Sequence, residues 1–171
     1  MKNIIILNGS GRKNGSTSKL VNAFTEGAKK AGNNVQEFFL QNMNIHGCLN
    51  CGGCKRNGNP CIQKDDMEQI YESFTTADIV VFASPIYFWT ITGILKTATD
   101  RLYALFNKFG MSDFKRESIL ILTAGAPYFD QPGHPVEWYR GFSKQIGWKN
   151  LGEILGADKI EEAKKIGESI K

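Results

Sequence analysis

The stretch from residue 3 to residue 18 constrains the fold of this chain most strongly. Residues 4–7 are Ile-Ile-Ile-Leu, an apolar run without polar alternation, which is typical of a strand buried on both faces. Three glycines follow, Gly9, Gly11 and Gly15, and they supply the backbone freedom of a tight loop. An amphipathic helix follows at once. Together these elements predict an anion site, because free backbone N–H groups and the helix dipole point at the loop.

The composition of the loop favours a phosphate as the anion. Its glycine spacing, Gly-x-Gly-x-x-x-Gly, misses the dinucleotide fingerprint by one position, and the next strand ends without an acidic residue to hold a ribose. The Gly-Lys-Ser/Thr signature of a nucleoside triphosphate loop is also missing. What remains is a loop for a terminal monophosphate, with a solvated Ser- and Gly-rich turn as the alternative. Its donor side chains are Ser10, Arg12, Ser16, Thr17 and Ser18.

The rest of the chain repeats the pattern of strand and helix. Its strands are near-continuous apolar runs, which predicts a parallel α/β sheet with helices on both faces. At 171 residues the chain is long enough for one buried domain and short for two. Ligands of such sheets bind outside the carboxyl ends of the strands. After the first strand and helix, we expect strands over 35–40, 78–84, 118–124 and 151–155, and helices over 65–75, 92–107, 136–147 and 158–170.

Two further loops at strand ends carry suggestive residues. The third strand ends in Ser84-Pro-Ile-Tyr-Phe-Trp89, which puts three aromatic side chains where a core does not need them. A flavin ring is planar and mostly apolar, so it requires flat packing partners and N–H donors. The alternative is that Phe88 and Trp89 belong to the core or to a subunit interface. The fourth strand carries Thr123 near its end and is followed by Gly125 and Ala126.

All four cysteines, Cys48, Cys51, Cys54 and Cys61, fall within one long connection over residues 41–64. Long connections are commonly functional. The spacing resembles the compact cysteine runs that ligate iron–sulfur clusters. A four-thiolate zinc site and a redox pair of Cys51 and Cys54 stay open as alternatives. Nearby His46 is not needed as a ligand when four thiolates suffice. His134, in a proline-rich loop, is a candidate for substrate contact or a plain surface residue.

Charge and hydropathy exclude several classes of partner. The net charge of +4 is mild and spread along the chain, whereas nucleic-acid binding calls for a clustered basic patch. No apolar run approaches the length of a membrane span, and no secretory signal precedes the first strand. We therefore expect a cytoplasmic protein that binds neither nucleic acid nor membrane.

The combination of motifs resembles the iron–sulfur flavoprotein branch of the NADPH-dependent FMN reductase family. The resemblance covers residues 3–103 closely and the remainder in outline. It implies a flavodoxin-like fold, a three-layer doubly wound sheet of five parallel strands in the order 2-1-3-4-5. The chain would then be a single FMN-binding domain over residues 1–171, with a cysteine-rich insertion at about 45–64. The matching segments are 8–17, 48–61, 64–67, 84–87 and 95–101.

The resemblance also implies roles for the site residues. The loop donors named above would hold the FMN phosphate, Pro85, Ile86, Tyr87, Phe88 and Trp89 would line the flavin ring, and Thr123, Gly125 and Ala126 would meet its pyrimidine side. The four cysteines would hold a 4Fe–4S cluster. A homodimer or homotetramer is implied, in which a neighbouring subunit covers the flavin.

The function implied by the resemblance is that of an FMN-dependent oxidoreductase. NAD(P)H or a ferredoxin-like protein would be the electron donor and a small molecule the acceptor. The flavin N5 carries the chemistry, so no catalytic side chain is expected. The alternative is a redox carrier or redox-sensing flavoprotein, without enzymatic turnover, whose cysteines form a zinc or thiol site.

Overall fold

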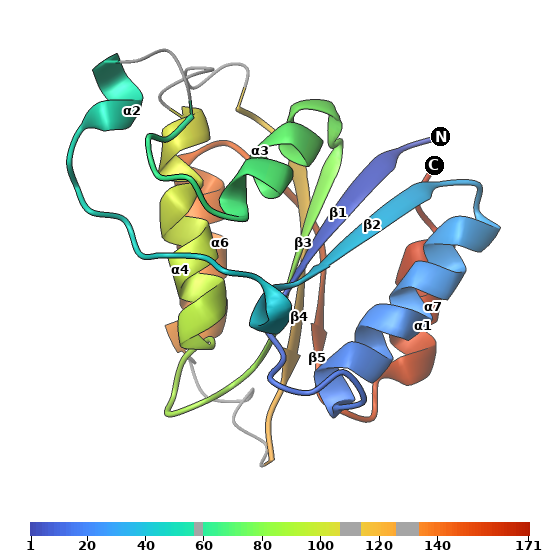
Figure 1. Cartoon of the computed structure of the whole chain (residues 1–171). Helices are drawn as coiled ribbons and strands as arrows, with labels where there is room; N and C mark the ends of the chain where they lie inside the picture. The colour runs from blue at the N-terminus through green and yellow to red at the C-terminus, as the bar shows by residue number, and fades with distance from the viewer. Residues whose placement is uncertain (57–59, 107–113, 126–133) are drawn as a thin grey trace.

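A five-stranded sheet forms the middle layer of the chain (Figure 1). The computed structural model describes residues 1–56, 60–106, 114–125 and 134–171. All neighbouring strands are parallel and their order is β2-β1-β3-β4-β5, which confirms the predicted flavodoxin-like arrangement. The strands are β1 (Asn3–Asn8), β2 (Asn34–Phe39), β3 (Ile79–Pro85), β4 (Glu117–Thr123) and β5 (Lys149–Leu155).

Helices cover both faces of the sheet, and they do so in two groups (Figure 1). One face packs against α1 (Ser16–Lys30) and α7 (Ile160–Glu168). The other packs against α3 (Met67–Thr76), α4 (Gly93–Arg101) and α6 (His134–Gln145). Two short helical segments, η1 (Leu40–Asn42) and α2 (Gly53–Arg56), belong to the long connection between β2 and α3.

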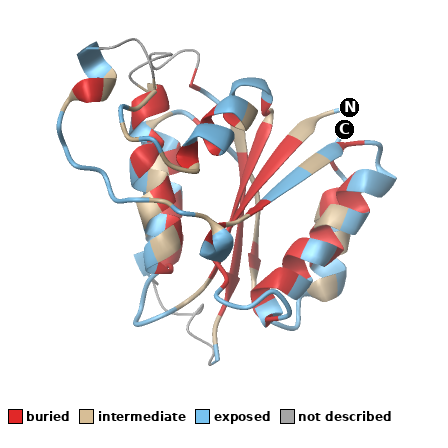
Figure 2. Ribbon diagram, in the orientation of Figure 1, coloured by how far each residue is buried: buried red, intermediate tan, exposed pale blue. Residues whose placement is uncertain are grey.

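The apolar run of β1 explains why the sheet has two cores. Successive side chains of a strand point to opposite faces. Ile4 and Ile6 therefore join the core under α1 and α7, while Ile5 and Leu7 join the core under α3, α4 and α6. The central strands are buried along nearly their whole length, as the red ribbon in Figure 2 shows. A strand buried on both faces has no room for polar alternation.

Helices α1 and α7 approach each other at backbone distance. A Cβ atom on Gly27 would overlap the Lys164 carbonyl oxygen, and one on Gly167 would overlap the Phe24 carbonyl oxygen. Each helix therefore places a glycine against the backbone of the other. This pairing ties the C-terminal helix to the helix that follows the first loop.

Most observed element ends differ from the predicted ones by a few residues. The helix predicted over 65–75 begins at Met67, with Asp66 at its N-cap. The helix predicted over 158–170 begins at Ile160, with Lys159 at its N-cap. The largest difference is at the helix predicted over 92–107, since α4 ends at Arg101. The fifth strand is longer than predicted, 149–155, and a shift of register between Ser118 and Ile119 accommodates its irregular sequence.

Candidate functional site

Three loops at the carboxyl ends of β1, β3 and β4 meet around one pocket of about 180 Å³. Each loop is one that sequence reasoning singled out. The pocket therefore lies where ligands of doubly wound sheets bind, at the point where strand order reverses between β1 and β3. Its walls are Ser10, Arg12, Gly15, Ser16, Thr17, Pro85, Ile86, Tyr87, Thr123, Ala124 and Gly125.

Some of the predicted residues do not line this pocket. Ser18 is buried behind the loop, whereas Phe88 and Trp89 stand outside the pocket and are 92% and 64% exposed. Ala126 lies outside the described residues. His134 is exposed at the start of α6.

Internal hydrogen bonds hold the first loop in its shape. The Arg12 carbonyl oxygen accepts from Ser10 Oγ at 2.9 Å and from Ser18 Oγ at 3.0 Å. The Ser10 amide donates to Asn8 Oδ1 at 2.9 Å. The Arg12 side chain is exposed, and no ion pair or hydrogen bond engages its guanidinium within the described part of the chain. The loop thus leaves one unpaired cation at the pocket wall.

Asn8 organises this loop, and sequence reasoning missed it. Its side chain is buried at the end of β1, where Nδ2 donates to Ser18 Oγ at 3.2 Å and to Glu37 Oε1 at 2.7 Å. Through Oδ1 and Nδ2 it therefore joins β1, β2 and α1. The available signal was a polar residue that closes an otherwise apolar strand.

The start of α1 supplies further donors to the pocket. The helix begins at Ser16 without a side-chain cap on its Gly15 N-cap, so the N–H groups of its first turn have no intrahelical acceptor. Ser16 and Thr17 both line the pocket. Thr17 Oγ1 lies 2.6 Å from Thr123 Oγ1, which joins the helix start to the end of β4. Uncapped N–H groups and the positive end of the helix dipole favour an anion here.

The first loop also lies in close contact with the start of α4. A Cβ atom on Gly9 would come within 2.5 Å of Thr92 Oγ1 and 2.8 Å of Leu95 Cβ. Thr92 Oγ1 donates to the Gly9 carbonyl at 2.9 Å, and the Thr92 amide donates to Ser84 Oγ at 3.0 Å. The glycine is required by this approach, which fixes the first and second loops relative to each other.

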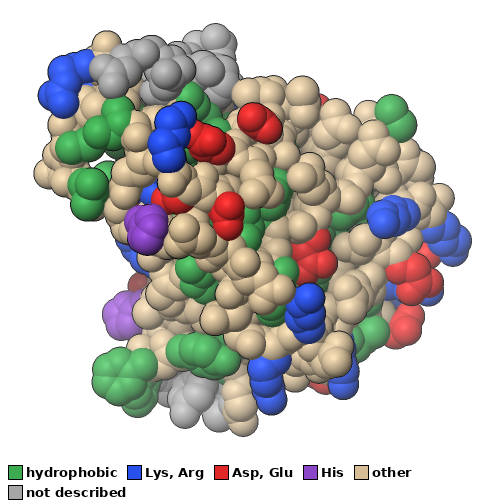
Figure 3. Space-filling view, in the orientation of Figure 1, with side chains coloured by type: hydrophobic (Ala, Val, Ile, Leu, Met, Phe, Trp, Pro, Cys, Tyr) green, Lys and Arg blue, Asp and Glu red, His purple; other side chains and the backbone are tan. Residues whose placement is uncertain are grey.

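The second loop ends in a tight turn with aromatic residues at its tip. The Tyr87 amide donates to the Thr90 carbonyl at 2.9 Å, and the Thr90 amide returns a bond to Tyr87 at 3.2 Å. Both tip residues have positive φ, +47° at Phe88 and +67° at Trp89, where large side chains are strained. Hydrophobic side chains protrude at the lower left of Figure 3. Exposed and strained aromatic residues of this kind mark candidate functional positions.

A second cavity, of about 210 Å³, is lined by all four cysteines. Cys48 and Cys51 are exposed, Cys54 and Cys61 are half-buried, and none of the four forms a disulfide. Among the described residues, no three His, Cys, Asp or Glu side chains converge as ligands of one metal ion. A single zinc ion requires its sulfur ligands about 2.3 Å from one point. The four cysteines thus share the lining of one cavity.

A buried ion pair ties the cysteine connection to α4. Arg101 Nη1 lies 2.7 Å from Asp65 Oδ2, Nη2 lies 3.1 Å from Oδ1, and the two side chains are only 1% and 0% exposed. Nη1 also donates to the His46 carbonyl at 2.7 Å, and the His46 amide donates to Asp65 at 3.0 Å. His46 thus contributes its backbone. Both ends of the connection are therefore attached to one guanidinium.

The same ion pair keeps both of its groups charged. Burial raises the pKa of Asp65, but the hydrogen bonds from Arg101 and from the His46 and Met67 amides outweigh burial, and the pKa lies below its usual value. Burial opposes the charge of Arg101 as well, yet its contacts with Asp65 raise the pKa above normal. Sequence reasoning missed this pair. The available signal was that Arg101 lies at helical spacing from Ala98 and Leu105, which are both on the buried face of the predicted helix.

Comparisons with known proteins identify the family of the chain. A family model described as NADPH-dependent FMN reductase matches residues 2–128. An iron–sulfur flavoprotein of Methanocaldococcus jannaschii is 38% identical over 102 residues, which are 60% of this chain and 51% of that protein. An iron–sulfur flavoprotein of Archaeoglobus fulgidus is 35% identical over 102 residues, 60% of this chain and 46% of that protein. The chain thus spans about half the length of these curated relatives.

Solved structures share the fold along the whole chain. The NAD(P)H:quinone oxidoreductase of Methanothermobacter marburgensis superposes with a TM-score of 0.75 at 18% identity, covering 98% of this chain and 96% of that one. At this level of identity the likeness establishes the fold alone. No described helix has the length and apolar character that a membrane crossing requires.

Proposed function

This chain belongs to the NADPH-dependent FMN reductase family, and on that premise we propose that it is an FMN-dependent oxidoreductase. It would pass electrons from a reduced donor, NAD(P)H or a ferredoxin-like protein, to a small-molecule acceptor. The observation that carries the proposal is the single pocket in which the phosphate-type donors of the first loop meet the loops after β3 and β4. When bound, FMN supplies hydride and single-electron chemistry.

In this proposal the first loop binds the FMN phosphate. Arg12 contributes an unpaired positive charge, and the Ser16 and Thr17 amides contribute uncapped N–H donors. Ser10 lines the same wall. Ser18 would not contact the phosphate. Its hydroxyl donates to the Arg12 carbonyl at 3.0 Å and so stabilises the conformation of the loop.

The flavin ring would lie against the second and third loops. Pro85, Ile86, Tyr87, Thr123 and Gly125 line the pocket and would orient the ring, with Ala126 beyond them. Phe88 and Trp89 project from the same rim. Their exposure supports a homodimer or homotetramer in which the two rings help to cover the flavin and exclude water.

We further propose that the cysteine cavity holds a 4Fe–4S cluster. Four cysteine side chains around about 210 Å³, none of them in a disulfide, fit the group in donor type and number, and a bound cluster supplies single-electron transfer. The buried Arg101 lines the same cavity and would offset the negative charge of the thiolates. The cysteine segment would be an insertion at about 45–64 in a single domain. Cysteines that form no disulfide are also consistent with a cytoplasmic site of action.

The central test is anaerobic purification followed by an absorbance spectrum and by flavin, iron, sulfide and zinc quantitation. We expect one FMN per chain together with iron and sulfide. Absence of FMN binding at any concentration would refute the oxidoreductase proposal. Stoichiometric zinc without sulfide would refute the cluster and leave the flavin proposal intact. Slow NAD(P)H turnover with rapid exchange with ferredoxin would favour the alternative of a carrier.

A matched pair of variants tests the phosphate site. Arg12→Ala removes a charge-assisted contact, and we expect FMN affinity to fall about tenfold or more. Lys13→Ala removes the neighbouring exposed cation, which lies over the Phe39 ring at 5.9 Å and not on the pocket wall. Affinity should change little in that control. Equal losses in both variants would indicate a diffuse charge effect and not a phosphate contact.

A further inference from the structure

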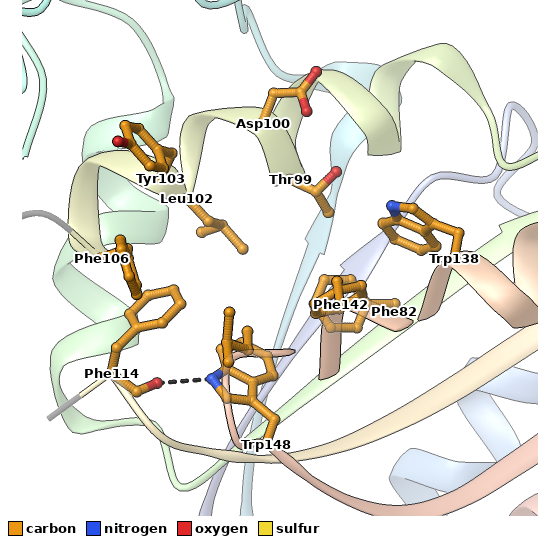
Figure 4. Close-up of a pocket in the computed structure, with 11 residues that line it drawn as sticks. Phe82, Thr99, Asp100, Leu102, Tyr103, Phe106, Phe114, Trp138, Phe142 and Trp148 are labelled. Atoms are coloured by element: carbon orange, nitrogen blue, oxygen red, sulfur yellow. Dashed lines mark hydrogen bonds between the residues drawn. The ribbon is translucent and has the colours of Figure 1, made fainter. Parts of the chain in front are cut away.

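A third pocket, lined by aromatic side chains, lies between α4 and α6 and is separate from the pocket proposed for FMN (Figure 4). Its volume is about 330 Å³, within the range of about 300 to 1,000 Å³ that small-molecule sites occupy. Figure 4 shows Phe82 of β3 beside Phe142 and Trp138 on the right of the view, with Phe106 and Phe114 on the left. The other lining residues are Thr99, Asp100, Leu102, Tyr103, Ile146 and Trp148.

The pocket opens to solvent, since Tyr103 is 49% exposed and Trp138 and Phe142 are half-buried. The rings around the pocket pack against one another. The ring centroids of Phe82 and Phe142 lie 5.3 Å apart in an edge-on arrangement, and those of Trp138 and Phe142 lie 4.9 Å apart. The space therefore persists between rings that are themselves in contact. A planar apolar molecule matches such walls.

Polar groups at the pocket favour a ligand with hydrogen-bond acceptors. The Trp148 N–H is used, since it donates to the Phe114 carbonyl at 2.8 Å. The Trp138 N–H has no acceptor within the described ranges, and Figure 4 shows its nitrogen on the side of the ring that faces Thr99. Asp100, at the rim, is paired with Lys96 at 2.5 Å. The open donor is suited to a carbonyl oxygen on the edge of a ring.

We propose that this pocket binds a planar apolar ring compound that carries carbonyl acceptors, the chemistry of a quinone. The aromatic walls would enclose the ring and the Trp138 N–H would donate to one carbonyl. Asp100 and Tyr103 line both this pocket and the cysteine cavity, so a bound ring lies beside the cysteines and away from the pocket proposed for FMN. A role as the electron acceptor rests on the proposed function, whereas binding itself does not.

Binding of duroquinone to the oxidised, FMN-loaded protein tests the proposal by equilibrium dialysis without reductant. Every ring carbon of duroquinone is substituted, so it does not add to free thiols. Thr99→Phe places a ring into the pocket from α4, and we expect affinity to fall about tenfold or more. Thr97→Phe makes the same change on the same helix at a residue that does not line the pocket, and affinity should be retained. Melting temperature and FMN content verify that both variants fold.

A second variant isolates the hydrogen bond. Trp138→Phe keeps a ring and removes the N–H, so duroquinone affinity should fall about threefold to tenfold. Durene, which has the same methylated ring without carbonyls, should bind the variant and the parent protein alike. Equal duroquinone binding by the Thr99→Phe and Thr97→Phe proteins would overturn the proposal, even if FMN binding and turnover are intact. Absence of duroquinone binding by the parent protein would overturn it too.

Discussion

Replacement of Arg101 by methionine tests how the cysteine connection is held. Methionine keeps the long apolar stem and removes the guanidinium, which makes two contacts to Asp65 and one to the His46 carbonyl. The carboxylate is then left buried with only backbone partners, the His46 and Met67 amides. Removal of one partner from a buried pair destabilises proteins by about 3 to 5 kcal/mol. Since two amide bonds remain on Asp65, we expect about 3 kcal/mol.

The assay is urea unfolding of the flavin-free protein, combined with the rate at which a thiol reagent modifies the cysteines. Arg101→Met should lower the free energy of unfolding by the stated amount and accelerate modification, because the connection loses its attachment to α4. Lys96→Met on the same helix is the matched control. Its ion pair with Asp100 is half-exposed, so its loss should change stability by less than about 1 kcal/mol.

The difference in the free energy of unfolding between the parent protein and Arg101→Met should depend on pH. The folded pKa of Asp65 lies below its usual value, so the pair stabilises the protein above about pH 4 and this contribution is lost as pH falls through the folded pKa. Without Arg101, burial would raise that pKa, and the variant would gain relative stability on acidification. The gap between parent and variant should therefore begin to shrink above about pH 4, as Asp65 of the variant is protonated, and shrink further below that pH as the parent loses its contribution. A loss under about 1 kcal/mol at pH 7, or a gap that grows on acidification, would refute the reasoning.

Two further predictions concern glycines and the aromatic turn. Gly27→Ala should destabilise the protein by about 1 to 3 kcal/mol in urea unfolding, because the new methyl group meets the α7 backbone. The control Gly141→Ala has no atom within 4 Å of the new Cβ and should stabilise the protein by about 0.5 to 1 kcal/mol. Equal effects of the two substitutions would contradict the close approach of α1 and α7. The double substitution of Phe88→Asn and Trp89→Gly should stabilise the flavin-free protein by about 1 kcal/mol, since both residues have positive φ, and should weaken FMN binding in a flavin titration. A less stable variant would show that the turn is not strained.

The local sequence pattern predicted much of the fold. An uninterrupted run from Ile4 to Leu7 requires burial on both faces, and repeated strand and helix signals require a parallel sheet. The loop composition likewise predicted an anion site from residues close together in the chain. Element ends were less accurate: the helix predicted to begin at Asp65 begins at Met67, and the Asp65 side chain pairs with Arg101 instead.

Contacts between residues far apart in the chain were decided by the tertiary structure. Asp65 meets Arg101 at a separation of 36 residues, Asn8 bonds Glu37 across 29, and no local pattern specifies such partners. The aromatic pocket between α4 and α6 also depends on residues that are far apart in the chain, such as Phe82 and Trp138. Their sequence pattern indicates burial but not a pocket.

The strand–loop–helix of residues 3–18 was thus determined by the sequence itself, because burial period and backbone freedom are local properties. Its orientation toward Tyr87 and Thr123, and hence the pocket, was decided by packing, since only the folded sheet brings the three strand ends together.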